Sequence, residues 1–421
     1  HSNIQGGYEG EGNIDSNPLF VDAANGDYRL SDYSPAIGTG TTSGAPSTDI
    51  NGSTRPNPAG SSPDMGAYEN SRSAPLEQTM YYVSTSGSAN GTGFSDSPMS
   101  SIQTAIGAST NGDTVLVAAG SYTENINYNG KDIVLKSADG PLTTILVPQN
   151  NSISAVRIMN NESPEAQFIG FTVKDGGNIR GSGIRIYGSP TIENCIIRDC
   201  GDAALATIHS SSEIRNSLFY DNFQSVFFDA NDQSDGPSLI NCTILNSDNF
   251  GVNSSATNGI PDIVNCIIFN NQSQNVNGPV NISYSLIGGG FNGTGNIDSN
   301  PLFVDAANDN FRLSNYSPAI GAGTVNGAPR NDINGDLRPS PSGSSPDMGA
   351  YENSRPSQRP KAGIVADGLG SDIAWGNSST QLSANWSAFE DDGDVTYEYA
   401  VGTSTNALAD VLDWTSNSAN T

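Results

Sequence analysis

The amino-acid sequence predicts an all-β fold: a right-handed parallel β-helix, a solenoid with three short strands per coil, followed by a C-terminal β-sandwich-like piece. Three observations support this prediction. A short apolar pattern recurs every 22 to 25 residues, a much longer block occurs twice, and turn-forming residues are abundant, with 47 Gly among 421 residues. Such regular recurrence is typical of solenoids and repeat arrays.

The charge balance excludes several classes of protein. Only 17 Lys and Arg stand against 44 Asp and Glu, so the net charge is −27 and no basic cluster is present for a nucleic acid. No apolar run approaches the roughly 18 residues of a membrane span. With two His and no C-x-x-C pair, we expect neither Ser-His-Asp catalysis nor a structural zinc site.

Five segments carry the short pattern, centred on Gly170, Asn194, Asn216, Asn241 and Asn265, so the steps between them are 24, 22, 25 and 24 residues. Apolar or small residues fill the second position before each centre and the first and third positions after it. The alternation breaks at the centre, as expected where two short strands meet at a corner. Stacked coils of this kind bury their apolar faces against one another.

The central asparagines have a physical reason to recur. A sharp corner favours a residue that tolerates left-handed backbone and whose amide can bond neighbouring backbone groups. Stacking predicts a structural ladder of Asn194, Asn216, Asn241 and Asn265, and a ligand-binding row of amides is the alternative. The next position predicts an inward stack of small side chains, Cys195, Ser217, Cys242 and Cys266. A disulfide between coils is the alternative for these cysteines, and Cys200 has no partner in the scheme.

The start of the solenoid is recognisable around residues 80–140. Tyr81–Val83 predicts a strand, and Ser100 or Ser101 is a candidate N-cap for a short helix in which Ile102, Ala105 and Ile106 share one face. Such a helix would cover the open end of the solenoid, where apolar core and unpaired strand edges are otherwise exposed.

The long repeat sets the predicted domain organisation. Residues 1–72 align without a gap to residues 284–355, and 53 of the 72 positions are identical. We expect residues 1–72 to be the C-terminal part of a preceding β-helix module, 73–79 a linker, and 80–355 a complete module. A second linker, 356–362, leads to 363–421, the start of a sandwich domain that is cut short. The sequence thus looks like a window on a longer, repetitive protein.

Three resemblances extend these predictions. IQTAIGASTNGDTVLVAAGSYTENI, from Ile102, resembles the beginning of many right-handed β-helix proteins of the pectate-lyase-like superfamily. The duplicated NPLFVDAAN, YSPAIG, DING and PDMGAYE segments resemble the choice-of-anchor Q domain of bacterial β-helix surface proteins. The alternating Leu382, Ala384 and Trp386, then Tyr397, Tyr399 and Val401, resemble the first strands of an immunoglobulin or fibronectin type III-like sandwich. These resemblances imply secretion and a cell-surface or extracellular location.

Calcium is the one cofactor that the residues suggest. The DING segments place Asp332, Asn334 and Asp336 at alternate positions, and Asp49 and Asn51 in the first copy, partly like an EF-hand loop. The twelve-residue pattern and its final Glu are missing, so a solvated Asx-turn is the competing interpretation. In the same blocks, Arg55 and Arg338 are expected to pair with the Asp that follows 9 residues later, or with Glu69 and Glu352.

We therefore favour a structural or adhesive segment of a large secreted surface or filament protein, acting as a stiff spacer. Neighbouring modules or copies and cell-surface glycans are its expected partners, with no nucleic acid and no membrane span. The alternative is a calcium-dependent polysaccharide lyase or glycoside hydrolase on the outer face of the solenoid. Its candidate groups include Arg198, Asp199 and Asp221, but no catalytic residue is assigned. Converging acids beside an Arg would favour the enzyme, and a flat ladder would favour the spacer.

Overall fold

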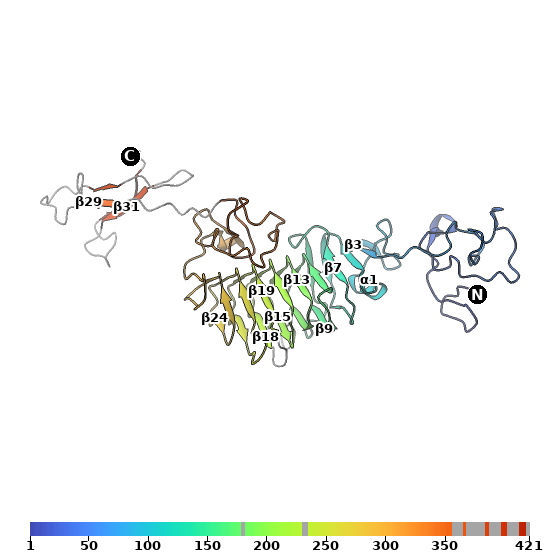
Figure 1. Cartoon of the computed structure of the whole chain (residues 1–421), viewed down its shortest axis with the longest axis horizontal. Coiled ribbons are helices and arrows are strands. Elements are labelled where there is room, and N and C mark those ends of the chain that lie inside the picture. The colour runs from blue at the N-terminus through green and yellow to red at the C-terminus, as the bar shows by residue number, and fades with distance from the viewer. Residues whose placement is uncertain are drawn as a thin grey trace.

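The computed structural model describes residues 1–177, 182–229 and 235–355, together with four strands of the C-terminal segment. Its central part is a parallel solenoid in which the chain visits three sheets in turn on each coil (Figure 1). The described helical elements are one α-helix, α1 (Ile102–Ala108), and two 3-10 turns, η1 (Ala23–Asn25) and η2 (Ala306–Asn308). The predicted all-β solenoid with three strands per coil is therefore confirmed.

The strands of each sheet follow one another at coil spacing. The first sheet has nine strands: β3 (Met80–Ser88), β4 (Thr114–Val117), β7 (Val134–Ser137), β10 (Gln167–Ile169), β13 (Thr191–Glu193), β16 (Glu213–Arg215), β19 (Ser238–Ile240), β22 (Asp262–Val264) and β25 (Asn281–Ser283). The second sheet has eight: β5 (Gly120–Thr123), β8 (Thr144–Val147), β11 (Thr172–Lys174), β14 (Ile196–Arg198), β17 (Leu218–Tyr220), β20 (Thr243–Leu245), β23 (Ile267–Phe269) and β26 (Leu286–Ile287). The third has seven: β6 (Ile126–Asn127), β9 (Val156–Glu162), β12 (Ile184–Gly188), β15 (Ala203–Ile208), β18 (Gln224–Asp229), β21 (Phe250–Ser254) and β24 (Gln274–Asn277).

The core of the solenoid is formed by the apolar positions of the short repeat. In the first sheet Ile192 lies beside Ile214, which lies beside Leu239 on the next coil. The three inward positions of the five repeated segments are fully buried, including Phe168, Cys195 and Ile268. Because successive side chains of a strand point to opposite faces, one such position per strand is enough to build a continuous core.

The corner between the first and second sheets is the predicted one. Asn194, Asn216, Asn241 and Asn265 have φ between 48° and 55°, and Gly170 has φ 78° at the same place one coil earlier. Left-handed backbone at these positions turns the chain from one sheet into the next, and Asn adopts it at lower cost than most residues. These four asparagines are referred to below as the asparagine corner.

Helix α1 covers the N-terminal end of the solenoid. The Ser101 hydroxyl accepts a hydrogen bond from the Thr104 N–H at 3.1 Å, which makes Ser101 the N-cap. Ile102, Ala105 and Ile106 are fully buried in the same cluster as the solenoid core. The helix therefore covers core that the first coil would otherwise expose to water.

Each copy of the long repeat forms a compact, strand-poor unit. The first block (residues 1–72) pairs β1 (Phe20–Asp22) with β2 (Asp27–Leu30), and the second block (residues 284–355) pairs β27 (Phe303–Asp305) with β28 (Asn310–Leu313) in the same register. The second block folds back along the side of the solenoid (Figure 1). This placement, which the sequence did not predict, creates the site described below.

In the C-terminal segment, β29 (Val365–Asp367) pairs with β30 (Ala384–Trp386) and β31 (Tyr397–Val401) pairs with β32 (Leu412–Asn417), both antiparallel. The predicted linker 356–362 and most of the segment 363–421 lie outside the described residues. The immunoglobulin or fibronectin type III-like assignment therefore stays a prediction.

Candidate functional site

The outer face of the second sheet is apolar along the coils that the second block covers. Ile196, Leu218, Thr243, Ile267 and Leu286 point outward from consecutive strands, yet all are buried. We call them the outer row. The apolar members pack with Phe311, Leu313, Ala319, Ile320 and Met348 of the second block in one cluster. The Tyr220 ring, also on the outer face, lies 5.1 Å from the Phe311 ring between centroids. The solenoid and the block thus share a second core, separate from the one inside the coils.

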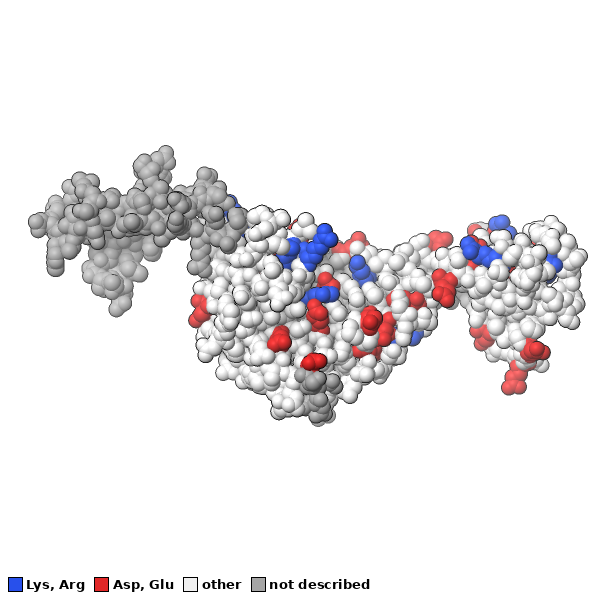
Figure 2. All heavy atoms as spheres, in the orientation of Figure 1, with Lys and Arg blue, Asp and Glu red and all other residues white. Residues whose placement is uncertain are grey.

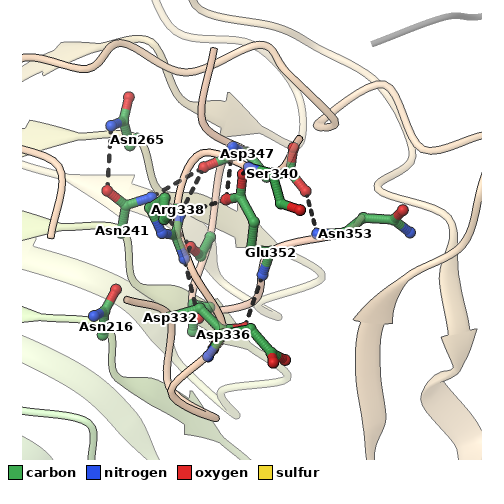
Figure 3. A network of polar contacts seen from close by, with 12 residues as sticks. Asn216, Asn241, Asn265, Asp332, Asp336, Arg338, Ser340, Asp347, Glu352 and Asn353 are labelled. Atoms are coloured by element: carbon green, nitrogen blue, oxygen red, sulfur yellow. Dashed lines mark hydrogen bonds and ion pairs between the residues drawn. The ribbon is translucent and has the colours of Figure 1, made fainter. Parts of the chain in front are cut away.

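The asparagine corner forms the polar edge of this contact (Figure 3). The Asn241 side-chain amide donates to the backbone carbonyls of Asp347 at 3.0 Å and Gly349 at 3.3 Å. The Asn216 amide donates to the Asn331 carbonyl at 2.5 Å. These bonds join residues more than one hundred positions apart in the chain.

Asn265 is bound from both sides. Its side-chain amide donates to the Thr324 carbonyl at 2.8 Å, and its side-chain oxygen accepts the Thr324 N–H at 2.7 Å. The same amide also reaches the Asn241 oxygen at 3.2 Å. Among the described residues, this is the one side-chain hydrogen bond between two members of the corner. The predicted ladder is therefore a row of residues whose amides mainly hold the second block.

The backbone of the second block comes very close to the solenoid at Gly349. Its N–H donates to the Asn265 carbonyl at 2.7 Å, and the Ala350 N–H donates to the Thr243 hydroxyl at 2.9 Å. Gly349 has φ 95°, and a Cβ there would fall 2.7 Å from the Thr243 Oγ1. Glycine is thus required both by the backbone conformation and by the approach.

A buried charged cluster supports this edge from inside the block. The Arg338 guanidinium lies 3.4 Å from the Glu352 carboxylate, and neither side chain is exposed. Arg338 also donates to the backbone carbonyls of Asp347, Gly349 and Ala350. The ion-pair partner is therefore Glu352, as Glu69 is for Arg55 at 2.8 Å in the first block. The sequence left either an Asp or a Glu as the partner of each Arg, and in both blocks the partner is the Glu.

Burial dominates the electrostatics of the cluster. It raises the pKa of Asp347 to about 7, with the Glu352 charge adding to the effect. Burial also raises the pKa of Asp332 and of Glu352, and it lowers the pKa of Arg338. One buried guanidinium thus lies among three buried carboxyl groups, whose pKa values burial raises.

The two DING segments form matching turns. One oxygen of Asp332 accepts the N–H groups of Asn334 and Asp336 at 2.8 and 2.9 Å, and the other accepts the Glu352 N–H at 3.0 Å. Asp49 accepts the N–H groups of Asn51, Ser53 and Glu69 in the same way. Both carboxylates are buried, so these are interior Asx-turns rather than the solvated turns expected. No group of three His, Cys, Asp or Glu side chains placed to hold a metal occurs within the described ranges.

The four residues of the inward stack, Cys195, Ser217, Cys242 and Cys266, are buried inside the coils, and a second polar row runs parallel to them. Cys195 N–H donates to the Ser217 hydroxyl at 3.2 Å and Cys242 N–H to the Cys266 sulfur at 3.4 Å. All four cysteines are free thiols. Cys200 begins the second row, because its N–H donates to the Asn222 side-chain oxygen at 3.0 Å. Later coils continue that row with Ser247 and Asn271.

The candidate enzymatic groups lie at the next corner, between the second and third sheets. Asp199 and Asp221 have φ 55° and 53°, and Asn246 and Asn270 continue the row at 53° and 57°. Arg198 forms an ion pair with Asp199. Burial raises the pKa of Asp221, and the nearby Asp309 and Asp199 add to it. Arg198, Asp199 and Asp221 therefore lie close together, as the enzyme interpretation expects. The two acids also belong to a row of corner residues, as the ladder interpretation expects. Figure 2 shows acidic side chains spread in small groups over the visible side of the molecule.

Comparison with known proteins agrees with the fold. Residues 143–301 match a family model described as "Right handed beta helix region". The central segment is a right-handed β-helix. Among solved structures, the chain is similar to the "Crystal structure of pectate lyase Pel9A", at 20% identity over 66% of this chain and 97% of that one, with a TM-score of 0.42. So low a TM-score carries no argument about activity. No curated protein matches the chain.

The outer row is the functional feature that sequence reasoning missed. The predicted pattern did not include the second position after each centre, which reads Thr, Ile, Leu, Thr and Ile in consecutive coils. An exposed face of a β-helix would carry polar residues at that position. The lack of charged and amide residues there was the available signal that another part of the chain covers this face.

Within the described residues, no helix is long and apolar enough to cross a membrane.

Proposed function

We propose that this chain is a structural or adhesive segment of a large secreted, repetitive bacterial cell-surface or filament protein. It acts as a stiff spacer that also contacts surface glycans. One observation supports this more than any other: the second block fills the outer face of the second sheet with apolar side chains. A face that is sealed in this way stiffens the β-helix from outside and leaves no groove for a polymer on those coils.

The architecture suits a spacer. Three parallel sheets of seven to nine strands run along one axis, and each coil adds about 4.8 Å, so the β-helix is about 40 Å long. The coils share one continuous core, so bending would have to break many contacts at once. A second block clamped along the side adds to that stiffness.

The finer parts of the proposal rest on resemblance. The duplicated block is assigned as a choice-of-anchor Q type domain, and the C-terminal segment as the beginning of a fibronectin type III-like module. Secretion and a surface location follow from these assignments. The scarcity of Lys and the wealth of Asn, Ser and Thr suit uncharged glycan partners and neighbouring modules. Calcium stays a proposed ligand, and at Asp332 it would have to compete with three backbone N–H groups.

A second candidate is a calcium-dependent polysaccharide lyase or glycoside hydrolase. The favouring observation is the convergence of Arg198, Asp199 and Asp221 at the corner next to the second block. Such a site would use Arg198 to bind an acidic sugar, and the two carboxyl groups to bind calcium or to transfer protons.

One experiment separates the two functions. The full chain is incubated with a panel of neutral and acidic polysaccharides, with calcium and with a chelator, and both retention and chain cleavage are measured. The spacer proposal predicts retention of some glycans without cleavage, and the same result from Asp221→Asn. Sustained turnover that disappears in Asp221→Asn would replace it with the enzyme.

A further inference from the structure

The first block exposes the surface that its copy buries. Tyr28 is 52% exposed, whereas its counterpart Phe311 is 2% exposed. Ile50 is 68% exposed, and its counterpart Ile333 only 6%. Ala67 is exposed while Ala350 is fully buried. The hydrogen bonds of Asp49 within the first block match those of Asp332 within the second. The difference in exposure therefore comes from what covers each block.

The same face has a depression whose lining includes apolar residues. This hollow of about 820 Å³ has Phe20, Leu30, Ala36 and Met65 in its lining, together with polar N-terminal residues such as Asn3 and with Asn90 of the following module. The counterparts of Leu30, Ala36 and Met65 are Leu313, Ala319 and Met348, which pack against the outer row of the β-helix. The hollow therefore lies on the side of the first block that corresponds to the apolar contact between the second block and the outer row.

The backbone groups through which the second block bonds the β-helix also have counterparts at the surface of the first block. The second block offers the Asn331 carbonyl, the Thr324 N–H and carbonyl, and the N–H groups of Gly349 and Ala350 to the β-helix. The counterparts in the first block are all at the surface: Thr48, Thr41, Gly66 and Ala67. A Cβ at Gly66 would meet nothing within 4 Å, unlike one at Gly349.

We propose that this open face of the first block is a docking surface for another right-handed β-helix, one with an asparagine corner and an apolar outer row. We define the open face as Tyr28, Ile50, Ala67 and the hollow beside them. The occupant would stand to the first block as the coils of Thr191–Ser283 stand to the second block, which follows them directly in the sequence. This inference rests on the proposed tandem arrangement of modules, and it adds the surface through which each block joins its own β-helix.

The occupant is a further β-helix rather than a second copy of this chain. The asparagine corner of every copy is already bound by its own second block. A second copy would have to displace that block, including the buried Arg338–Glu352 pair, to offer its corner. A β-helix without a block of its own has no such obstacle.

The test grafts the expected occupant onto the full chain. A second copy of residues 80–283 is fused directly before residue 1, and Ile50→Cys is introduced into both the fused and the unfused chain. The native thiols are buried, and burial raises the pKa of Cys195 and Cys200 to about 12, so maleimide reports the new thiol. Val21→Cys is the matched control, because Val21 and its counterpart Val304 are 51% and 55% exposed.

We expect fusion to slow the labelling of Ile50→Cys at least about tenfold and to leave Val21→Cys unchanged. Asn241→Ala with Asn265→Ala in the added copy should restore fast labelling. Equal labelling of Ile50→Cys in both chains would overturn the inference, and so would protection that survives loss of the asparagines. Protection in the unfused chain that rises with concentration would instead identify a second copy as the occupant. None of these results depends on polysaccharide retention, so failure here leaves the proposed function to its own test.

Discussion

Asn241, at a corner of the β-helix, donates its side-chain amide to the backbone carbonyl of Asp347, 106 residues later in the chain. This bond shows what the repeated asparagines contribute. They turn the chain between two sheets, and three of them also hold the block that follows the β-helix.

The contribution of this bond can be measured with a matched pair of variants. Asn241→Ala removes the bonds to the Asp347 and Gly349 carbonyls, whereas Asn194→Ala makes the same change at a corner whose side chain does not bond the block in the described part of the chain. Both carry the cost of Ala in left-handed backbone. We expect Asn241→Ala to lose about 1–3 kcal/mol more free energy of unfolding in urea titration. Equal losses would mean that the corner does not hold the block.

The apolar half of the contact offers a second matched pair. Phe311→Ala would open a cavity next to Tyr220 and cost about 3–5 kcal/mol. Tyr28→Ala, at the equivalent position of the first block, is exposed and should cost under about 0.5 kcal/mol. Thermal unfolding followed by circular dichroism compares the two. A large loss in Tyr28→Ala would show that its face is covered in the chain as it stands.

Removing only one member of the buried Arg338–Glu352 ion pair should lower the free energy of unfolding more than removing both. Arg338→Met leaves the Glu352 carboxylate buried without its cation, and we expect a loss of about 3–5 kcal/mol. The double variant Arg338→Met with Glu352→Gln removes the charge as well, so it should recover part of that loss. A double variant that is less stable than Arg338→Met would contradict the buried geometry.

The pKa of Asp347 predicts the pH dependence of stability. Its value rises from 3.8 to about 7 on folding, so the folded chain holds a proton that the unfolded chain releases between these values. The free energy of unfolding should therefore fall as pH rises from about 4 to 7, by at most about 1.4 kcal/mol per pH unit. Asp347→Asn should reduce this slope, and Asp332 and Glu352, whose pKa values burial also raises, should account for the remainder. The variant loses stability at every pH because its amide faces backbone N–H donors.

Asp27→Asn serves as the control for the pH series. The hydrogen bond and charge of Arg29 lower the pKa of Asp27 to about 2, so it does not titrate in this range. Urea titrations at several pH values would show the slope unchanged in this variant. A wild-type slope of the opposite sign would contradict the buried state of Asp347.

The sequence was sufficient for the coils because their chemistry is local. A 22- to 25-residue period, an Asn at each corner and a Ser at the start of α1 each follow from the backbone geometry of a few neighbouring residues. A Ser N-cap at position 100 or 101 and the buried position of Cys195 were predicted for these reasons, and the structure has Ser101 as the N-cap.

The docking of the second block could not be predicted in the same way. It joins Asn216 to Asn331 and Thr243 to Ala350, and no periodicity of the sequence relates those positions. The choice of Glu352 over Asp347 as the partner of Arg338 depended on side-chain direction, which spacing alone does not give. Only the apolar residues of the outer row pointed toward a covered face.

Amide hydrogen exchange on the unmodified full chain tests the docking of the second block most directly, because the first block provides an internal control. The N–H groups of Gly349 and Ala350 donate to Asn265 and Thr243, whereas their counterparts Gly66 and Ala67 lie at the surface. We predict slow exchange at Gly349 and Ala350 and fast exchange at Gly66 and Ala67. Equally fast exchange at both pairs would contradict the docking of the second block on the asparagine corner.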